Sequence, residues 1–225
     1  MLGFATEKNP KGPSTGSMSH CHFDLSGTIL TVQIPDGNCK DHPDPQGKIT
    51  NKINIYENTL STNCDNDSYV VILQRSYCYS AFMQPKLGTI QLRIMVIGTG
   101  DHNTNLFKDN VRECIITDIY RSFESFNREA DQGIYPPKEF TSLTINNQKW
   151  LRYEIDDQGR AYPNYCFVIS PNHYITIGFN YIVERDPNEP WLLMAKQLEK
   201  DIMSSVKVEL SPSAKAELED AVKSK

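Results

Sequence analysis

The sequence predicts an α+β fold: an antiparallel β-sheet with a long central helix and a C-terminal helix packed on it. The clearest strand covers residues 174–183, where apolar and polar side chains alternate as in a half-buried strand. After Pro190, a favoured first residue of a helix, apolar side chains recur at helical spacing from Trp191 to Ser205. A longer helical pattern lies between two groups of strands, and this order is typical of an α+β protein. The side chains on the two C-terminal apolar faces are Ile175, Ile177, Phe179, Tyr181 and Val183, then Trp191, Met194, Ala195, Leu198 and Ile202.

The first half of the chain supplies the strands that begin the sheet. The most regular covers residues 89–97, where Ile90 and every second residue to Val96 are apolar while Gln91 and Arg93 are polar. Turn residues separate the strands, and we place one such turn at residues 84–88, which read Gln-Pro-Lys-Leu-Gly. The other strands are expected at residues 23–34, 52–56 and 69–76.

The long helix is expected to begin after Asn103 or Thr104, either of which can accept a hydrogen bond from a free first-turn amide. Apolar residues then recur at spacings of three and four as far as Phe126. The pattern predicts about six or seven turns at the usual helical pitch. Gly133 permits the left-handed conformation that ends many helices.

A meander of strands and a final helix complete the predicted domain, which we place at residues 20–210. The meander turns at Asn146-Asn147 and contains a strand at residues 149–156. A Pro/Gly-rich linker long enough to divide the chain is absent from the sequence, so we expect a single α+β domain. Residues 211–225 begin with the helix signal Ser211-Pro212 but share little apolar face, which predicts a weakly helical tail.

Residues 1–19 are predicted to be a disordered tether or the remnant of an expression tag, because they are rich in Gly, Pro, Ser, Thr and Lys. Gly16-Ser17-Met18 is typical of a cloning junction followed by a native start at Met18, which would make the protein cytoplasmic. The alternative is a natural arm left after a lipoprotein signal is removed, which would make it periplasmic. No apolar run approaches the roughly 20 residues that cross a bilayer, so we expect no transmembrane segment.

The six cysteines leave the redox compartment open. Cys39 and Cys64 lie in polar loops and are the pair we expect if a disulfide forms, whereas Cys114 and Cys166 lie on apolar faces. Zinc-type ligands occur at His20-Cys21-His22, Cys39 and His42. Their spacing matches no standard zinc motif, so we expect no metal.

Two further motifs resemble ligand sites only in part. Gly98-Thr99-Gly100 lacks the third glycine of a dinucleotide fingerprint, because Asn103 occupies that position. Asp65-Asn66-Asp67 begins like a calcium loop, but Val70 and Ser76 stand where the loop requires glycine and glutamate. We expect no cofactor.

The sequence contains neither a Gly-x-Ser-x-Gly elbow nor a cysteine in a nucleophile context. We therefore favour a non-enzymatic role. The alternatives are a hydrolase whose site is assembled in space, with His102 or His173 as the base, and a periplasmic lipoprotein of envelope function. A formal charge of -5 argues against a nucleic-acid partner.

Aromatic residues in predicted loops are the strongest functional signal. Tyr and Arg supply rigid amphipathic contact area and are enriched at the centres of protein interfaces. We therefore predict that the chain binds another protein through these loops; the sequence does not indicate an oligomeric state. The predicted partner-binding residues are Tyr77, Tyr79, Phe82, Tyr135, Arg160 and Tyr162.

The order of elements resembles the PsbP/DcrB-like fold group. The likeness is carried by residues 23–37, which end in Ile34-Pro35-Asp36-Gly37, by Trp150 to Glu154, by Tyr174 to Phe179, and by the helix that closes with Ser204-Ser205-Val206. Residues 51–88 depart from it as a longer strand-rich middle. The resemblance implies a non-enzymatic adaptor, for example a bacterial immunity or chaperone protein that recognises a secreted effector or secretion component. It transfers no catalytic residue.

Overall fold

The computed structural model describes residues 8–39, 51–56, 68–82, 84–99, 104–130, 134–135, 137, 139–157, 160–183 and 189–224. Its elements are β1 (Met18–Leu25), β2 (Thr28–Pro35), β3 (Lys52–Ile53), β4 (Ser68–Ala81), β5 (Gln84–Gly98), α1 (Val111–Ala130), β6 (Ile134–Tyr135), β7 (Phe140–Ile145), β8 (Gln148–Asp157), β9 (Arg160–Ser170), β10 (His173–Val183), α2 (Pro190–Ser205), β11 (Lys207–Glu209) and α3 (Pro212–Lys223). The predicted α+β class is confirmed.

Across the described residues the strands form two sheets, where the sequence predicted one. The smaller has the order β11-β2-β1-β3, and the larger has the order β4-β5-β10-β9-β8-β6, with β7 also paired to β8. Every described pairing is antiparallel except the short one between β1 and β3. Because β1 and β11 pair with β2 on its two sides, β2 has no free edge with which to join β4. The C-terminal strand β11 therefore returns to complete the N-terminal sheet.

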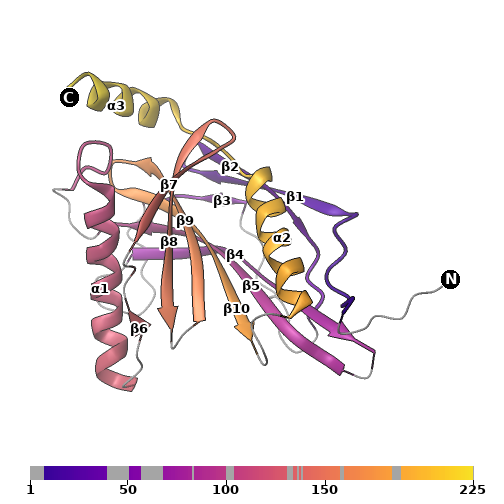
Figure 1. Ribbon diagram of the computed structural model, residues 1–225. Helices are drawn as coiled ribbons and strands as arrows, with labels where there is room; N and C mark the ends of the chain where they lie inside the picture. The colour runs from indigo at the N-terminus through magenta and orange to yellow at the C-terminus, as the bar shows by residue number, and fades with distance from the viewer. Residues whose placement is uncertain are drawn as a thin grey trace.

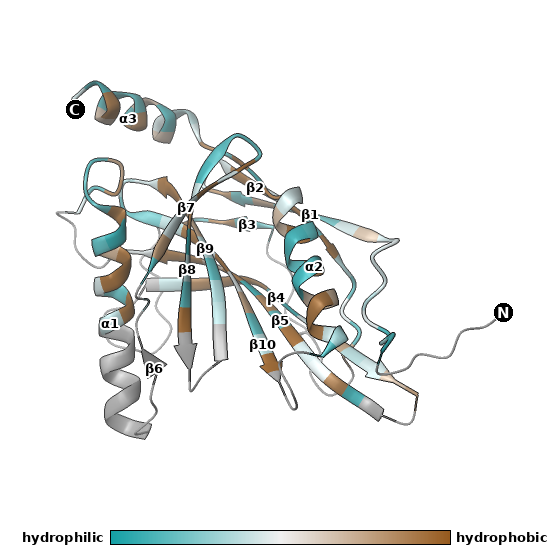
Figure 2. Ribbon diagram, in the orientation of Figure 1, coloured by the Kyte–Doolittle hydropathy of each residue, from teal (hydrophilic) through white to brown (hydrophobic). Residues whose placement is uncertain are grey.

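The larger sheet buries both faces. One face packs against the smaller sheet and α2, and the other contacts α1. The alternating faces predicted for β5 and β10 are confirmed, since every side chain of two alternating sets is at most 1% exposed: Ile90, Leu92, Ile94 and Val96, and Ile175, Ile177 and Phe179. Figure 1 shows α2 in front of the strands near the smaller sheet and α1 beside the β6–β8 end. Figure 2 shows hydrophobic residues following the strands between these layers.

The predicted long central helix is wrong. Helix α1 starts at Val111, has 20 residues and lies at one end of the larger sheet. The residues before it form turns: Asn105 Oδ1 accepts the Phe107 N–H at 3.0 Å, and Asn110 Oδ1 accepts the Arg112 N–H at 3.2 Å. The Asn105 bond gives the backbone an alternative to the helix, whereas the Asn110 bond caps the first turn of α1, so the helix begins after Asn110.

The hairpin of β4 and β5 is longer than the sequence indicated. Residues 84–88, expected to be a turn, belong to β5. A Cβ atom on Gly88 would lie 2.3 Å from Cζ2 of Trp191, so this glycine is needed for helix packing rather than for a turn. The turn predicted at Asn146-Asn147 is confirmed, with φ angles of 48° and 62°.

Both ends of the described chain contact the fold. Lys11 pairs with Ser80 and Pro10 is buried, where a disordered tether was expected, and β1 begins at Met18 rather than at residue 20. The helix predicted after Ser211 is present as α3, in which Ala214 and Ala221 are buried.

A disulfide joins Cys39 to Cys78, with a Cα–Cα distance of 5.1 Å. The expected partner of Cys39 was Cys64, which lies outside the described residues, and this prediction is wrong. Beside the disulfide, Asn38 Nδ2 donates to the Cys78 carbonyl at 2.9 Å and Asn38 Oδ1 accepts the Cys78 N–H at 2.7 Å. The pair of bonds copies one step of strand pairing on the outer edge of β4.

A similar amide contact closes the outer edge of β11. Gln148 Nε2 donates to the Val208 carbonyl at 2.6 Å, and Gln148 Oε1 accepts the Val208 N–H at 3.1 Å. Asn146 adds two donor bonds, to the carbonyls of Ser204 and Val206. Among the described residues, an amide side chain therefore joins the sheets at each of two corners, where it binds the backbone of an edge strand, β4 or β11.

Candidate partner-binding surface

Trp191 fixes the first turn of α2 on the β4–β5 hairpin. Its side chain is 0% exposed, lies against Gly88 and pairs with the Tyr79 ring at a centroid distance of 5.7 Å. The stripe of Trp191, Ala195, Leu198 and Ile202 predicted from helical spacing is buried. This packing determines which side of α2 faces outward.

The predicted aromatic loop at residues 77–82 is a strand for most of its length. Tyr77 and Tyr79 lie in β4 and are 0% and 1% exposed, so the prediction that they lie in a loop is wrong. Tyr77 Oη donates to the Pro35 carbonyl at 3.2 Å. Burial raises the pKa of Tyr79 well above its usual value. Both rings belong to the core in this conformation, and the partner-binding role assigned to them stays a prediction.

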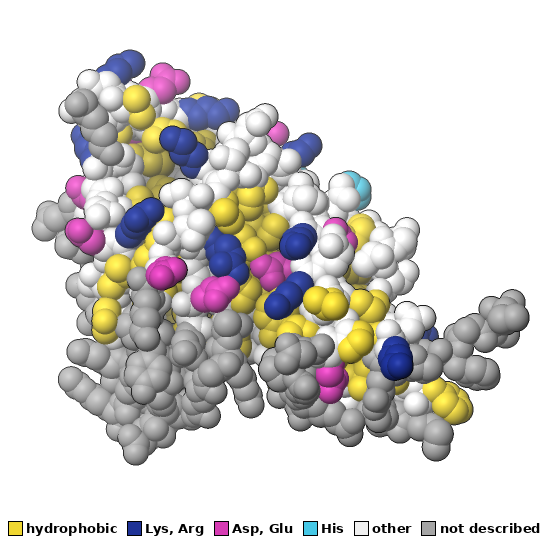
Figure 3. Space-filling view, viewed as in Figure 1, with side chains coloured by type: hydrophobic (Ala, Val, Ile, Leu, Met, Phe, Trp, Pro, Cys, Tyr) yellow, Lys and Arg dark blue, Asp and Glu magenta, His cyan; other side chains and the backbone are white. Residues whose placement is uncertain are grey.

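Phe82 lies at the end of β4 and is 66% exposed, as a partner-binding residue requires. Leu193 and Met194, on the outward side of the first turns of α2, are 69% and 39% exposed. Met194 was expected in the buried stripe, but only one side of the helix reaches the sheet. We call Phe82, Leu193 and Met194 the α2–hairpin surface. Figure 3 shows hydrophobic side chains over the starting end of α2 and at the end of the hairpin, with Lys or Arg side chains beside them.

The other three predicted partner-binding residues lie on other strands, Tyr135 on β6 and Arg160 and Tyr162 on β9. Tyr162 is half-buried in β9, while the side chains of Tyr135 and Arg160 lie outside what the structure describes. Strands β5 and β10 separate β9 from β4, which places β9 about 14 Å from β4 at the usual strand spacing. The partner-binding role predicted for these residues stays a prediction.

A buried polar cluster beneath α2 was not predicted from the sequence. Glu199 is 7% exposed and accepts hydrogen bonds from Tyr165 Oη at 2.5 Å and from Tyr181 Oη. Burial, followed by the contacts with Glu199, raises the pKa of both phenols well above their usual value, so both remain donors at neutral pH. The signal that could have found Glu199 is its position, four residues after Ala195 on the buried stripe.

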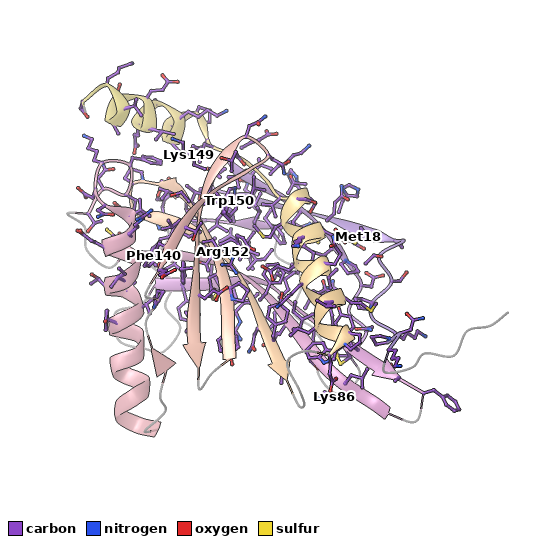
Figure 4. The ribbon with its side chains drawn as sticks, in the orientation of Figure 1. Met18, Lys86, Phe140, Lys149, Trp150 and Arg152 are labelled. Carbon is purple, nitrogen blue, oxygen red and sulfur yellow. A yellow bond between two sulfur atoms is a disulfide. The ribbon has the colours of Figure 1, made fainter. Side chains whose placement is uncertain are left out.

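Arg152 extends this cluster toward the surface. Its guanidinium carbon is 5.9 Å from the centroid of the Tyr165 ring, and it forms an ion pair with Glu154. The bonds from Tyr165 and Tyr181 to Glu199 join α2 to β9 and β10. In Figure 4 Arg152 lies on β8 and Lys86 lies at the far end of β5, beside the hairpin.

His173, a candidate base of the hydrolase alternative, lies beside a hydroxyl group. Its Nδ1 lies 2.9 Å from Ser170 Oγ, and the ring also hydrogen bonds to the backbone of Ile55. Ser170 is 1% exposed and is only three residues from His173, within the β9–β10 turn. A buried hydroxyl that already accepts the Asn172 N–H is a turn contact and offers a substrate no approach. His102 lies outside the described residues.

The described part of the chain contains no group of three or more His, Cys, Asp or Glu side chains able to hold a metal. Cys39, one of the zinc-type ligands considered from the sequence, is bound in the disulfide. A search of the described helices finds none that is long and apolar enough to cross a membrane.

Comparison with known proteins does not assign a family. The sequence matches no family and no curated protein. Among solved structures, the chain is similar to the solution structure of cyanobacterial PsbP (CyanoP) from Synechocystis sp. PCC 6803, with 12% identity and a TM-score of 0.37. The match covers 92% of this chain and 95% of the other. A TM-score this low does not establish a shared fold, so the PsbP/DcrB-like resemblance stays a prediction.

Proposed function

We propose that this chain is a non-enzymatic protein-binding module that recognises its partner through the α2–hairpin surface. The observation that carries the proposal is the exposure of three large apolar side chains, Phe82, Leu193 and Met194, on two elements that pack together. Such side chains lose contact with water when a partner covers them, and buried apolar anchors dominate the energy of most interfaces.

The charges around this surface are mixed. Lys86 on the hairpin and Lys196 and Lys200 on α2 are accompanied by Glu189 at the start of the helix and by Asp201. A partner with an apolar centre and a border that carries both signs of charge would complement it. Because the Trp191 contact holds α2 on the hairpin, the anchors are positioned before the partner arrives, which reduces the entropy lost on binding.

A more specific form of the proposal is a bacterial immunity or adaptor protein that recognises a secreted effector. It is supported by the chain's acidity and size and by the resemblance drawn from its sequence. Its test is separate: a toxin or secretion component encoded beside this gene should bind the purified chain, and failure of such neighbours to bind would remove the specific form only.

The binding proposal can be tested by affinity capture from the source organism with two matched variants. Leu193→Ser and Val222→Ser each remove an exposed apolar side chain from a helix surface, 69% and 66% exposed in the wild type. A partner of the α2–hairpin surface should bind at least about tenfold more weakly to Leu193→Ser, the loss typical of an interface anchor, and normally to Val222→Ser. Phe82→Ser should behave as Leu193→Ser does.

The melting temperatures of all three variants should match that of the wild type, because the changed side chains are exposed. Equal capture by Leu193→Ser, Phe82→Ser and the wild type would contradict the choice of this surface.

A further inference from the structure

A cavity of about 740 Å³ lies at the opposite end of the molecule from the hairpin. It is bordered by the residues that lead into α1, the start of β8, the end of β9, and α3. This volume is within the range of about 300 to 1,000 Å³ usual for small-molecule sites. The apolar side chains that line it include Leu106, Val111, Trp150, Phe167, Leu210 and Leu218.

The cavity opens where two strands of the larger sheet separate. The pairing of β8 with β9 ends at Leu151 and Cys166, although β8 begins at Gln148 and β9 continues to Ser170. Beyond these two residues the backbone N–H and C=O groups of β8 and β9 are not paired with each other, and these groups border the cavity. The rings of Trp150 and Phe167, one from each strand, are in tilted contact beside this opening, with centroids 5.0 Å apart.

Trp150 is a second observation that points to a binding site. The residue is 1% exposed, and its indole nitrogen has no hydrogen-bond acceptor among the described residues. Buried donors are almost always paired in folded proteins, so an unpaired one beside a cavity can be satisfied by a water or by a molecule that enters the cavity. Trp191, the other tryptophan, also lacks an acceptor but does not line this cavity.

The border of the cavity is positively charged. Arg112 and Lys149 line it, and neither forms an ion pair with a carboxylate in the described part of the chain; Arg112 Nη2 only reaches Ser142 Oγ, at 3.5 Å. The acidic residue of the lining is Asp109, whose Oδ2 accepts the Asn105 N–H at 2.6 Å, so the lining carries two cations and one carboxylate.

The two cations lie on the same side of the sheet. Ser142 is opposite Leu151 in the β7–β8 pairing, and Lys149 is two residues from Leu151, so these side chains share the face that Arg112 approaches. Figure 4 shows Lys149 and Trp150 next to each other at the start of β8, near α3.

We propose that this cavity binds a small amphipathic anion, with its apolar chain along the Trp150 and Phe167 rings where β8 and β9 separate, and with its anionic head between Arg112 and Lys149. Leu210 and Leu218, from the C-terminal segment, cover the apolar chain. The site is independent of the α2–hairpin surface, so either proposal can fail alone.

Decanoate is a suitable probe, and decan-1-ol is its uncharged control. With only two tryptophans in the chain, the indole N–H region of a ¹H–¹⁵N spectrum contains two signals, which a Trp150→Phe variant assigns. Decanoate should move the Trp150 signal and leave that of Trp191 in place. An unmoved Trp150 signal at millimolar decanoate, or equal movement of both signals, would overturn the site.

The position of the anionic head is tested by charge variants measured by calorimetry. Arg112→Gln with Lys149→Gln should weaken decanoate binding about tenfold and leave decan-1-ol binding unchanged, because charge-assisted bonds to the head are lost. Lys196→Gln with Lys200→Gln removes the same total charge from α2 and should leave decanoate affinity unchanged. Equal decanoate affinity in both double variants would overturn the assignment of Arg112 and Lys149.

Discussion

The two corners at which the sheets meet use the same contact with different reinforcement. At one corner, Asn38, which follows β2 of the smaller sheet, binds the backbone of Cys78 on the edge strand β4. At the other, Gln148 from the larger sheet binds the backbone of Val208 on the edge strand β11. The Asn38 corner is exposed and also carries the disulfide, whereas the Gln148 corner is partly buried and has hydrogen bonds alone.

The difference shows how burial and covalent bonding substitute for each other. An exposed hydrogen bond competes with water and contributes little to the stability of the fold. A covalent bond therefore adds more stability at the exposed corner. A partly buried amide has no such competitor, and its backbone partners would be left unpaired without it. Both corners also occupy sheet edges, which otherwise offer unpaired backbone groups to another chain.

Removal of the disulfide should have the largest effect on stability. Cys39 and Cys78 are 39 residues apart, and closing a loop of this length is expected to stabilise the fold by about 4 kcal/mol on chain entropy. The measurement is the free energy of unfolding in urea for Cys39→Ser with Cys78→Ser against the wild type.

A reducing agent should lower the stability of the wild type to that of the double variant and leave the double variant unchanged. Cys21, Cys114 and Cys166 are free and provide no second disulfide within the described residues. Insensitivity of the wild type to reduction would mean that the exposed corner does not depend on its covalent bond.

Gln148→Ala should have the next largest effect, about 2 kcal/mol, because it leaves the N–H and the carbonyl of Val208 unpaired in a partly buried site. The measurement is again unfolding in urea. The matched control is Gln197→Ala, which removes an exposed amide that bonds only to Asp201 on the same helix, and which should change stability very little.

Equal losses for Gln148→Ala and Gln197→Ala would break the comparison, since burial would then not distinguish an amide at a corner from one on a helix surface. Hydrogen exchange adds a local measure: the Val208 amide should lose protection in Gln148→Ala and keep it in Gln197→Ala.

Asn38→Ala should cost about 1 kcal/mol, because the two bonds it removes are exposed and the disulfide still holds Cys39 beside Cys78. The sharper measurement is a double-mutant cycle with the disulfide variant. Asn38→Ala should cost less when the disulfide is absent, because the freed loop no longer holds the amide beside the strand. Purely additive losses would show that the two contacts at this corner act independently.

Periodicity predicted the parts of this molecule whose burial follows local sequence. The faces of β5 and β10 and the stripe from Trp191 to Ile202 are buried as expected, because a strand or helix in a layered fold turns one regular face inward. The prediction that Met194 is buried was wrong. How many side chains of the apolar stripe reach the sheet depends on how α2 lies on it, which the sequence of α2 alone does not encode.

The corners could not be predicted in this way. Asn38 and Gln148 are polar residues near turns, and their partners lie 40 and 60 residues away. The same reason explains the wrong pairing of Cys39 with Cys64, since two cysteines in polar loops are indistinguishable until strand registers are known. Of the α2–hairpin surface, Phe82 could be predicted as a loop aromatic, while Leu193 became visible only once Trp191 had fixed the inward side of α2.

A third junction between the sheets should respond to pH, unlike the two amide corners, and its effect should be the smallest. The His173 ring, at the start of β10, hydrogen bonds to the backbone of Ile55 beside β3 and packs against the Tyr56 ring at 5.4 Å. Burial lowers the pKa of His173 below its usual value, because the charged form is poorly solvated there; the bond to Ile55 opposes this. The pKa of Tyr56 is raised, mainly by burial and then by the charge of Glu217, so its phenol stays neutral throughout.

A histidine whose folded pKa lies below its unfolded value stabilises the fold fully above the unfolded value of about 6.5. As the pH falls below that value, the unfolded chain takes up a proton before the folded chain does, and stability is lost until the folded pKa is passed. Unfolding in urea between pH 8 and pH 5 should therefore show a smaller acid loss in His173→Gln, which cannot titrate, than in the wild type. Gln148→Ala should keep the full acid loss, because an amide does not titrate in this range. Identical pH profiles for His173→Gln and the wild type would show that this junction, like the amide corners, is indifferent to acid.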